Sequence, residues 1–203
     1  MVEVYYYVPV EQVENAVECG LKLSKWYEKE VRIGLDKKKC MSALLNPKDD
    51  MVKYKSDALR CVKLEIYPRY CYVADRYLYE VGLTHSEVMQ LYLESVMPIE
   101  NYTFGLYRLP ECLVTTTVIG EQISILDKRL DSPILFDNSE DLYINNIIED
   151  YKGIYPNFND MMLYYFYSYL VEKEKLKRYE DEDVVVFVDK EIERPFAIKK
   201  PPI

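Results

Sequence analysis

One glutamate stands where a carboxylate could do chemistry. Glu111 follows Pro110 and precedes the apolar, β-branched segment 112–118, which is typical of a buried strand. A carboxylate at the mouth of such a strand is costly unless it is paired, hydrogen-bonded or facing a cleft. It could stabilise a developing positive charge or act as a base. Glu111 is therefore the catalytic candidate of this sequence.

A second short phrase lies upstream, where residues 46–51 read Asn-Pro-Lys-Asp-Asp-Met. Asn46 has two interpretations, since it either shapes a binding pocket or caps the helical turn that Pro47 begins.

Other residue types exclude several chemistries. The chain has one histidine, His85, so neither a Ser/His/Asp triad nor an ordinary zinc site is supported. The five cysteines are an odd number without C-x-x-C spacing. We expect them to be reduced, and we expect no metal site.

Charge and hydropathy bear on location and partners. A net charge of -9 disfavours a protein that coats nucleic acid non-specifically. Basic residues nevertheless crowd one early segment, as a local patch or as an ordinary solvated surface: Lys22, Lys25, Lys29, Arg32, Lys37, Lys38 and Lys39. The N-terminus lacks a signal-peptide pattern, and the apolar run 161–170 is too short to span a bilayer. These features predict a cytoplasmic protein without a membrane partner.

The elements that must position these residues alternate between strands and helices. We expect a strand at 2–8, a helix from Pro9 that ends at Gly20, and a polar loop with a helical turn at 22–40. The further elements expected are strands at 41–45, 61–67, 71–74 and 184–188 and helices at 84–96, 137–151 and 157–175. The sequence predicts one α+β domain over 1–203, with 189–203 as an extended tail.

Tyrosine is unusually frequent, with 21 in the chain, and several lie on the predicted helix 157–175. Aromatic residues on every face of a helix indicate burial on more than one side. Stacking of nucleic-acid bases is the alternative, but it usually accompanies basic residues. We therefore expect these rings to lie either in the core or in a subunit interface, and the second alternative would make the protein a homodimer.

The two phrases belong to a longer series of short motifs. These motifs are Tyr5-Tyr6-Tyr7-Val8, Gly20-Leu21 after a helix, Asn46-Pro47-Lys48 with Met51, Asp75 at a strand end, and Glu111-Cys112-Leu113-Val114. Their order and spacing over the first 125 residues resemble the DarT-type ADP-ribosyltransferases, toxins of toxin–antitoxin systems that modify thymidine in single-stranded DNA. The chain departs from the family at Tyr6, where the family has histidine, at Lys48, where it has arginine, and at Cys112, where it has phenylalanine.

The resemblance implies an ADP-ribosyltransferase-like fold, a pair of small packed sheets flanked by helices with an NAD cleft between them. NAD would be the substrate, and the acceptor would be a base of a single-stranded nucleic acid or a protein. Cleavage of the nicotinamide bond passes through an oxocarbenium-like state, which Glu111 would stabilise. Tyr6 would contact nicotinamide or its ribose, Asn46 would shape the pocket and Tyr54 would stack on the nicotinamide ring. Arg32, or one of the lysines at 37–39, would meet the pyrophosphate.

Two rival interpretations remain open. The loss of the family histidine favours a non-catalytic module that keeps the fold for binding or regulation. The tyrosine-rich helix favours an unrelated α+β interaction protein that dimerises. The ADP-ribosyltransferase interpretation predicts one continuous mixed sheet over 1–125, with Tyr6 and Glu111 lining a single cleft. A position of these two residues on opposite sides would count against it.

Overall fold

The computed structural model describes residues 1–126 and 138–201, and its contacts divide the chain into two compact units. Unit 1 is Met1–Asn145 and unit 2 is Asn146–Ile203. The sequence predicted one domain over 1–203. The difference arises because the last strands close a separate small core, which is described by itself below.

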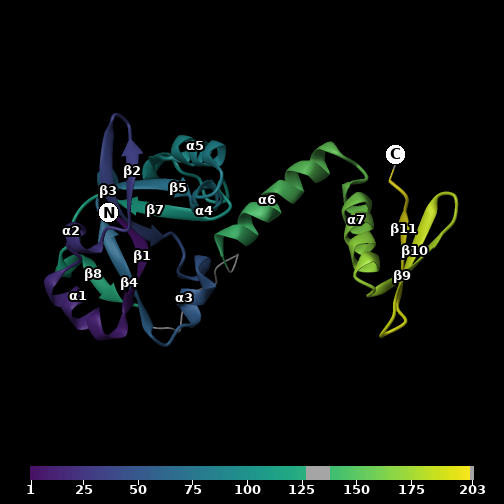
Figure 1. The fold of residues 1–203 in the computed structure, drawn as a ribbon, viewed down its shortest axis with the longest axis horizontal. Coiled ribbons are helices and arrows are strands. Elements are labelled where there is room, and N and C mark those ends of the chain that lie inside the picture. Colours follow the sequence, from purple (N-terminus) through teal and green to yellow (C-terminus); the bar gives the residue numbers. More distant parts are fainter. Residues whose placement is uncertain (127–137, 202–203) are drawn as a thin grey trace. The chain divides into compact units, whose positions relative to one another are not determined.

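Unit 1 is built on one sheet, which contains eight strands among the described residues. The strands are β1 (Val2–Pro9), β2 (Lys29–Ile33), β3 (Asp36–Leu44), β4 (Leu59–Ile66), β5 (Cys71–Asp75), β6 (Met97–Pro98), β7 (Pro110–Val114) and β8 (Ile123–Ile125). Their order is β6-β5-β7-β3-β1-β4-β8, and β2 pairs with the outer part of β3 (Figure 1). All these pairs are antiparallel. The fold is α+β, and the expected continuous sheet is present among the described residues of unit 1, but it is antiparallel rather than mixed.

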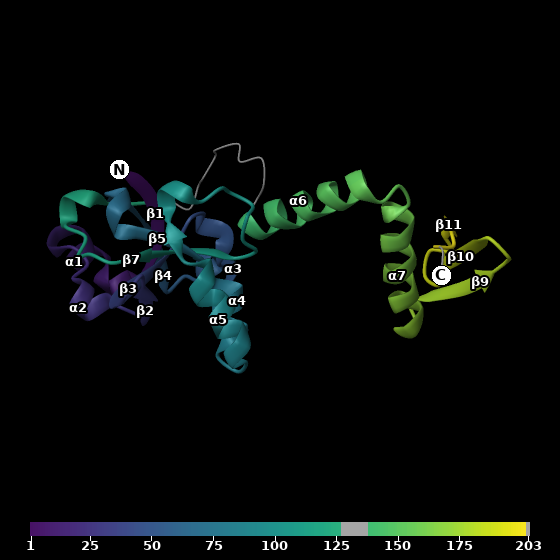
Figure 2. The same cartoon turned by 90° about the horizontal axis from the view of Figure 1, so that it is seen from above.

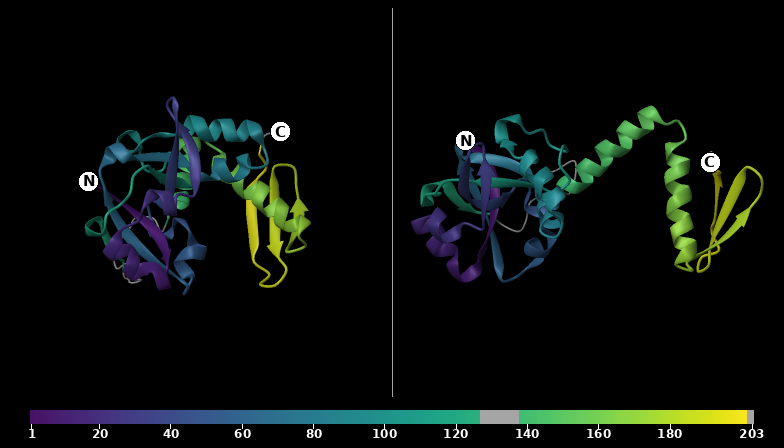
Figure 3. Two further views of the ribbon diagram at one scale, coloured as in Figure 1. Left: turned by 60° about the vertical axis from the view of Figure 1, so that its left-hand side comes forward. Right: turned by 45° about the horizontal axis from the view of Figure 1, so that its top comes forward.

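The segment predicted as a polar loop forms structure instead. Residues 22–40 hold a helical turn, α2 (Leu23–Trp26), and a hairpin of β2 with the first half of β3 that extends beyond the rest of the sheet (Figures 1 and 3). Gly34 makes the turn with a φ of 65°. Most hairpin side chains face solvent, so the sequence looks polar. Val31 and Cys40 are the buried hydrophobic residues of 29–40.

The helices of unit 1 are short, and several fall where the sequence predicted them. They are α1 (Val13–Cys19), α3 (Met51–Lys55), α4 (Arg76–Gly82) and α5 (Ser86–Ser95), and α6 (Ser139–Ile154) begins here and crosses the unit boundary. Helix α1 ends as predicted at Gly20, whose φ is 80°. Asp137, expected among the caps of α6, lies outside the described residues.

The two faces of the unit 1 sheet carry different cores. The larger one includes Val4, Tyr6 and Val8 of β1, together with residues of every neighbouring strand. The smaller one lies on the opposite face under α4 and α5 and includes Leu113 and Tyr92. Because successive side chains of a strand point to opposite faces of the sheet, the position of a residue along its strand decides which of the two cores it joins.

Unit 2 packs helix α7 (Phe158–Glu172) on a three-stranded antiparallel sheet, which consists of β9 (Leu176–Glu180), β10 (Val184–Asp189) and β11 (Pro195–Lys199) (Figure 2). Phe187 is fully buried at its centre, against Tyr164 and Tyr167 of α7. The sequence predicted an extended tail over 189–203. This prediction is wrong for residues 195–199, which form strand β11 and pair with β10. None of the described helices is both long and apolar enough to span a bilayer.

Candidate functional site

The main site is built around Glu111 on β7, a central strand of the unit 1 sheet. Register places Glu111 beside Leu44 of β3 on one side and beside Ala74 of β5 on the other. Its side chain is fully buried. A carboxylate in this position must be compensated by partners from the surrounding elements.

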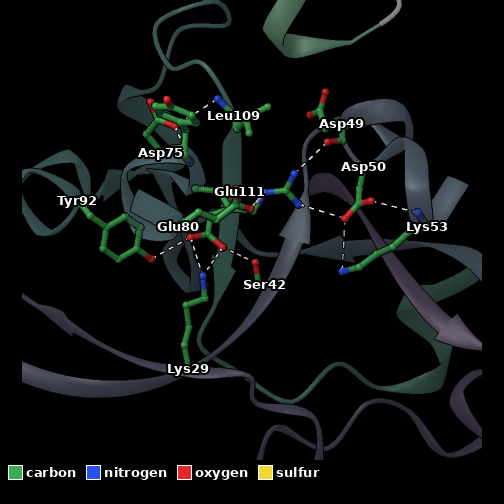
Figure 4. Close-up of polar contacts among 12 residues, drawn as sticks. Lys29, Ser42, Asp49, Asp50, Lys53, Asp75, Glu80, Tyr92, Leu109 and Glu111 are labelled. Atoms are coloured by element: carbon green, nitrogen blue, oxygen red, sulfur yellow. Dashed lines mark hydrogen bonds and ion pairs between the residues drawn. The ribbon is translucent and has the colours of Figure 1, made fainter. Parts of the chain in front are cut away.

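The partners come from three different elements. The ammonium Nζ of Lys29, on the β2–β3 hairpin, lies 3.0 Å from Glu111 Oε1 and 2.9 Å from Oε2. The Tyr92 hydroxyl of α5 donates to Oε1 at 2.9 Å, and the Ser42 hydroxyl of β3 donates to Oε2 (Figure 4). Glu111 is thus held in a paired network and does not lie free in a cleft.

The Lys29 ammonium is itself enclosed. Its Nζ lies 3.7 Å from the centroid of the Tyr79 ring and 5.7 Å from that of Tyr92, and 9% of its side chain is exposed. A carboxylate and the faces of aromatic rings both attract cations. The cluster of Glu111, Ser42, Tyr79 and Tyr92 is therefore a preorganised site for positive charge, and Lys29 fills it.

Burial also sets the protonation of the neighbouring groups. Burial raises the pKa of Tyr92, and the nearby Glu111 raises it further, so the Tyr92 hydroxyl keeps the proton that it donates. Burial and the same carboxylate raise the pKa of Cys40 to about 11. Cys40 therefore remains a thiol at neutral pH and is no activated nucleophile.

Tyr6 does not join this cluster. The register aligns Tyr5, Leu44 and Glu111 in one row across β1, β3 and β7, so Tyr6 points to the opposite face of the sheet. There it lies in the larger core, and its hydroxyl donates to Glu28 Oε1 at 2.5 Å. The prediction that Tyr6 and Glu111 line one cleft is wrong, because β3 separates their strands and the alternation separates their faces.

The neighbouring Tyr7 occupies the face that was expected for Tyr6. It shares the face of Glu111, and its hydroxyl donates to the Pro47 carbonyl oxygen at 2.7 Å. Asn46 precedes that proline and caps the turn, since its side chain accepts from the Lys48 amide at 2.9 Å. The capping interpretation of Asn46 is confirmed. Tyr54 is half-buried on α3 (Met51–Lys55).

Arg32 lies elsewhere on the hairpin. It lines a cavity with Lys38 and Tyr72, and Glu111 is not among the residues of that cavity. Of the basic residues in this segment, Lys29 meets Glu111. From the sequence, Arg32 and the lysines at 37–39 were the candidates for binding the pyrophosphate of NAD. Lys29, which pairs with Glu111, was not among them.

A second polar network holds the chain that leads into Glu111. Asp75 accepts from the backbone amides of Arg108 and Leu109, each at 3.2 Å, just before β7 begins. Arg76 bridges to the Asp50 carboxylate at 3.3 Å and to the Asp49 carbonyl oxygen at 3.1 Å (Figure 4). These contacts fix the start of β7 relative to α3 and α4.

Three partners of Glu111 were not found from the sequence: Lys29, Ser42 and Tyr92. Ser42 alone left a signal, because it is a hydroxyl inside the otherwise apolar strand segment 41–45. Lys29 was one of many lysines, and Tyr92 was one of 21 tyrosines. Only the pairing of distant strands and the packing of α5 bring them together.

Comparison of the chain with family models, curated proteins and solved structures gave no match. Within the described ranges, no group of three or more His, Cys, Asp or Glu side chains could hold a metal ion.

Proposed function

We propose that unit 1 cleaves NAD at the bond between nicotinamide and ribose, with Glu111 as the catalytic carboxylate, as in the ADP-ribosyltransferases that the sequence resembles. Tyr6 and Glu111 lie on opposite faces of the sheet, which counts against the cleft that the resemblance implied, so the proposal rests on the geometry around Glu111 alone. The observation that carries the proposal is the Lys29 ammonium held between both Glu111 oxygens and the Tyr79 ring. A site that holds a cation in this way would also stabilise the positive charge that develops on ribose.

Each partner of Glu111 has a role in this chemistry. The Ser42 hydroxyl fixes one carboxylate oxygen and the Tyr92 hydroxyl fixes the other, so the carboxylate needs no reorganisation when charge develops. Ser42 is half-buried, so it links the buried carboxylate to the surface. In this proposal Tyr7, which shares the face of Glu111, takes the place that the resemblance gave to Tyr6.

Lys29 must leave before NAD can bind. Its ammonium occupies the position of the expected positive charge, and two positive charges at one carboxylate would repel each other. The hairpin that carries Lys29 extends beyond the rest of the sheet (Figure 3). Its displacement would expose Glu111. The acceptor remains a base of a single-stranded nucleic acid or a protein.

A specific observation also favours a second candidate, the non-catalytic module. The Glu111 side chain is 0% exposed and its carboxylate is fully engaged by Lys29, Ser42 and Tyr92. If Lys29 never leaves, this network only stabilises the fold. The surface used for binding would then lie elsewhere on unit 1.

Nicotinamide release from NAD separates the two candidates. We expect Lys29→Met to raise the rate and Glu111→Gln to lower it by about a hundredfold or more, the effect of removing a key electrostatic group. Glu28→Gln is the matched control, because Glu28 pairs with Tyr6 on the other face. Circular dichroism would verify folding. If neither wild type nor Lys29→Met binds or cleaves NAD, the transferase is refuted and the module stands.

The third interpretation, dimerisation through the tyrosine-rich helix, rests on exposed rings of α7. The exposed fractions are 65% for Tyr165, 54% for Phe166 and 52% for Tyr169. Sedimentation of the protein with and without Phe166→Glu tests it. A monomer at every concentration would refute this role.

A further inference from the structure

Helix α7 of unit 2 is apolar on two sides, and the sheet of its unit lies along one of them (Figures 1 and 2). The residues that pack on the sheet core are Tyr164, Tyr167, Leu170 and Val171. The large apolar residues of the helix that are exposed are Met162, Leu163, Tyr165, Phe166 and Tyr169. Because an α-helix has 3.6 residues per turn, Met162, Tyr165 and Tyr169 form a stripe opposite the sheet. An exposed apolar stripe of this kind marks a contact surface.

An aromatic hollow continues the stripe at the N-terminal end of α7. Its volume is about 210 Å³, and it is lined by Tyr151 and Tyr155 of the first helix and by Phe158 and Met161 of α7. The Tyr151 and Phe158 rings stack there, with their centroids 5.8 Å apart and 19° between their planes. Small-molecule sites start at about 300 Å³, so the hollow is better matched to a side chain of a partner than to a free ligand.

Opposite charges lie at the two ends of the stripe. Lys173 follows α7 at its C-terminal end, and its Nζ lies 5.4 Å from the centroid of the Tyr169 ring. At the other end, Asp150 directly precedes the tyrosines of the hollow in the sequence. Glu149 pairs with Lys152 at 2.8 Å, whereas the side chains of Asp150 and Lys173 form no ion pair with another described residue. The surface therefore has an unpaired anion at one end and an unpaired cation at the other.

A second copy of the chain supplies both complements at once. When two α7 helices pack antiparallel about a two-fold axis, the C-terminal end of each lies at the N-terminal end of the other. In a pair centred between residues 165 and 166, residue 173 of one copy lies opposite residue 158 of the other. A parallel pair would instead place Lys173 beside Lys173, a repulsion between like charges. The charges of the stripe thus favour the antiparallel arrangement.

We propose that unit 2 forms an antiparallel homodimer in which Tyr169 and Lys173 of each copy occupy the aromatic hollow of the other, with Lys173 beside Asp150 of the partner subunit. The Tyr169 ring packs on the aromatic lining, and the faces of these rings attract the Lys173 ammonium. The proposal rests on the dimerisation interpretation given above, to which it adds the helix direction and the hollow. It does not rest on NAD cleavage, because all these residues belong to unit 2.

Sedimentation equilibrium of the full chain tests the contact of the Tyr169 ring. We expect wild type to form a dimer, and Tyr169→Ala to weaken it by about tenfold or more, because a buried aromatic anchor dominates an interface. Tyr179→Ala is the matched control. Tyr179 is exposed to a similar extent and pairs with Val186, which places it on the sheet face away from α7. Its loss should change the affinity by less than about twofold.

Reversal of the end charges tests the direction of the helices. Lys173→Glu or Asp150→Lys puts like charges at both ends of the dimer, so each variant alone should dimerise about tenfold or more weakly than wild type. An equal mixture of the two variants regains both ion pairs and should form a mixed dimer with nearly the affinity of wild type, which also shows that both variants are folded. Lys177→Glu, on the same sheet face as Tyr179, is the control and should leave the affinity within about twofold.

Each contrary result has a distinct meaning. A wild type that is monomeric at every concentration would overturn the proposal together with the dimerisation interpretation. A dimer that Tyr169→Ala leaves unchanged would overturn the proposed contact, and dimerisation through another surface would stand. A mixture of Lys173→Glu and Asp150→Lys that dimerises no better than either variant alone would overturn the antiparallel arrangement.

Discussion

The Lys29–Glu111 ion pair should dominate the electrostatic contribution to the stability of unit 1. Both side chains are nearly or fully buried, at 9% and 0% exposed. Removal of one partner leaves the other charge buried and uncompensated, which costs about 3–5 kcal/mol. In Glu111→Gln one of the two oxygens that contact the Lys29 ammonium becomes an NH2 group, so a donor faces a donor at that position. In Lys29→Met the carboxylate keeps only the Ser42 and Tyr92 hydroxyls.

A double-mutant cycle measures the pair itself. Each single variant, Lys29→Met or Glu111→Gln, should lower the free energy of unfolding by about 3 kcal/mol. The double variant should differ from wild type by about 1 kcal/mol or less, because it contains no unpaired charge. The resulting coupling energy would be well above the few tenths of a kcal/mol found for independent sites.

Urea unfolding followed by fluorescence is a suitable assay, since Trp26 is the single tryptophan of the chain. Its ring packs at the larger core of unit 1, 6.2 Å from the Tyr6 ring, so its signal reports on that unit. Lys63→Met is the control, because Lys63 pairs with Glu3 and Glu65 at the surface, where solvent screens the charges, and its loss should leave the free energy of unfolding almost unchanged. Single effects below about 1 kcal/mol that simply add would refute the reasoning.

Three further changes test other parts of the structure. Tyr6→Phe removes the hydrogen bond to Glu28 and should cost about 1–3 kcal/mol in urea unfolding without changing NAD affinity, and a loss of NAD affinity would contradict the register. Burial raises the pKa of Asp49, so the folded protein holds this proton to a higher pH than the unfolded chain does. The free energy of unfolding of wild type, measured relative to Asp49→Asn by urea unfolding at several pH values, should therefore fall as the pH rises above 3.8. A relative stability that rose with pH would reverse the sign of this linkage. Gly20→Ala should lower the melting temperature, because its Cβ would lie 2.3 Å from the Val118 carbonyl oxygen, whereas Gly153→Ala, with no atom within 4 Å, should not.

The sequence by itself determined the strands and helices whose side chains have a clear period. The alternation in 61–67 predicted β4, and the helix start at Pro9 with Gly20 at its end predicted α1. Glu111 was recognised because a carboxylate beside an apolar strand has to be compensated. Such local signals need no knowledge of the partner strands.

Tertiary structure decided everything that depends on pairing. A shift of one residue along β1 moves a side chain to the other face of the sheet. The sequence pattern suggested Tyr6 as the partner of Glu111 in the site, whereas the register brings Tyr7 to the face of Glu111. The hairpin at 29–44 looked polar because its strands are exposed beyond the sheet. That same hairpin places Lys29 beside the carboxylate of Glu111, which lies 82 residues away along the chain. Long-range strand pairing of this kind leaves no local pattern in the sequence, which is why the partner of Glu111 could not be read from it.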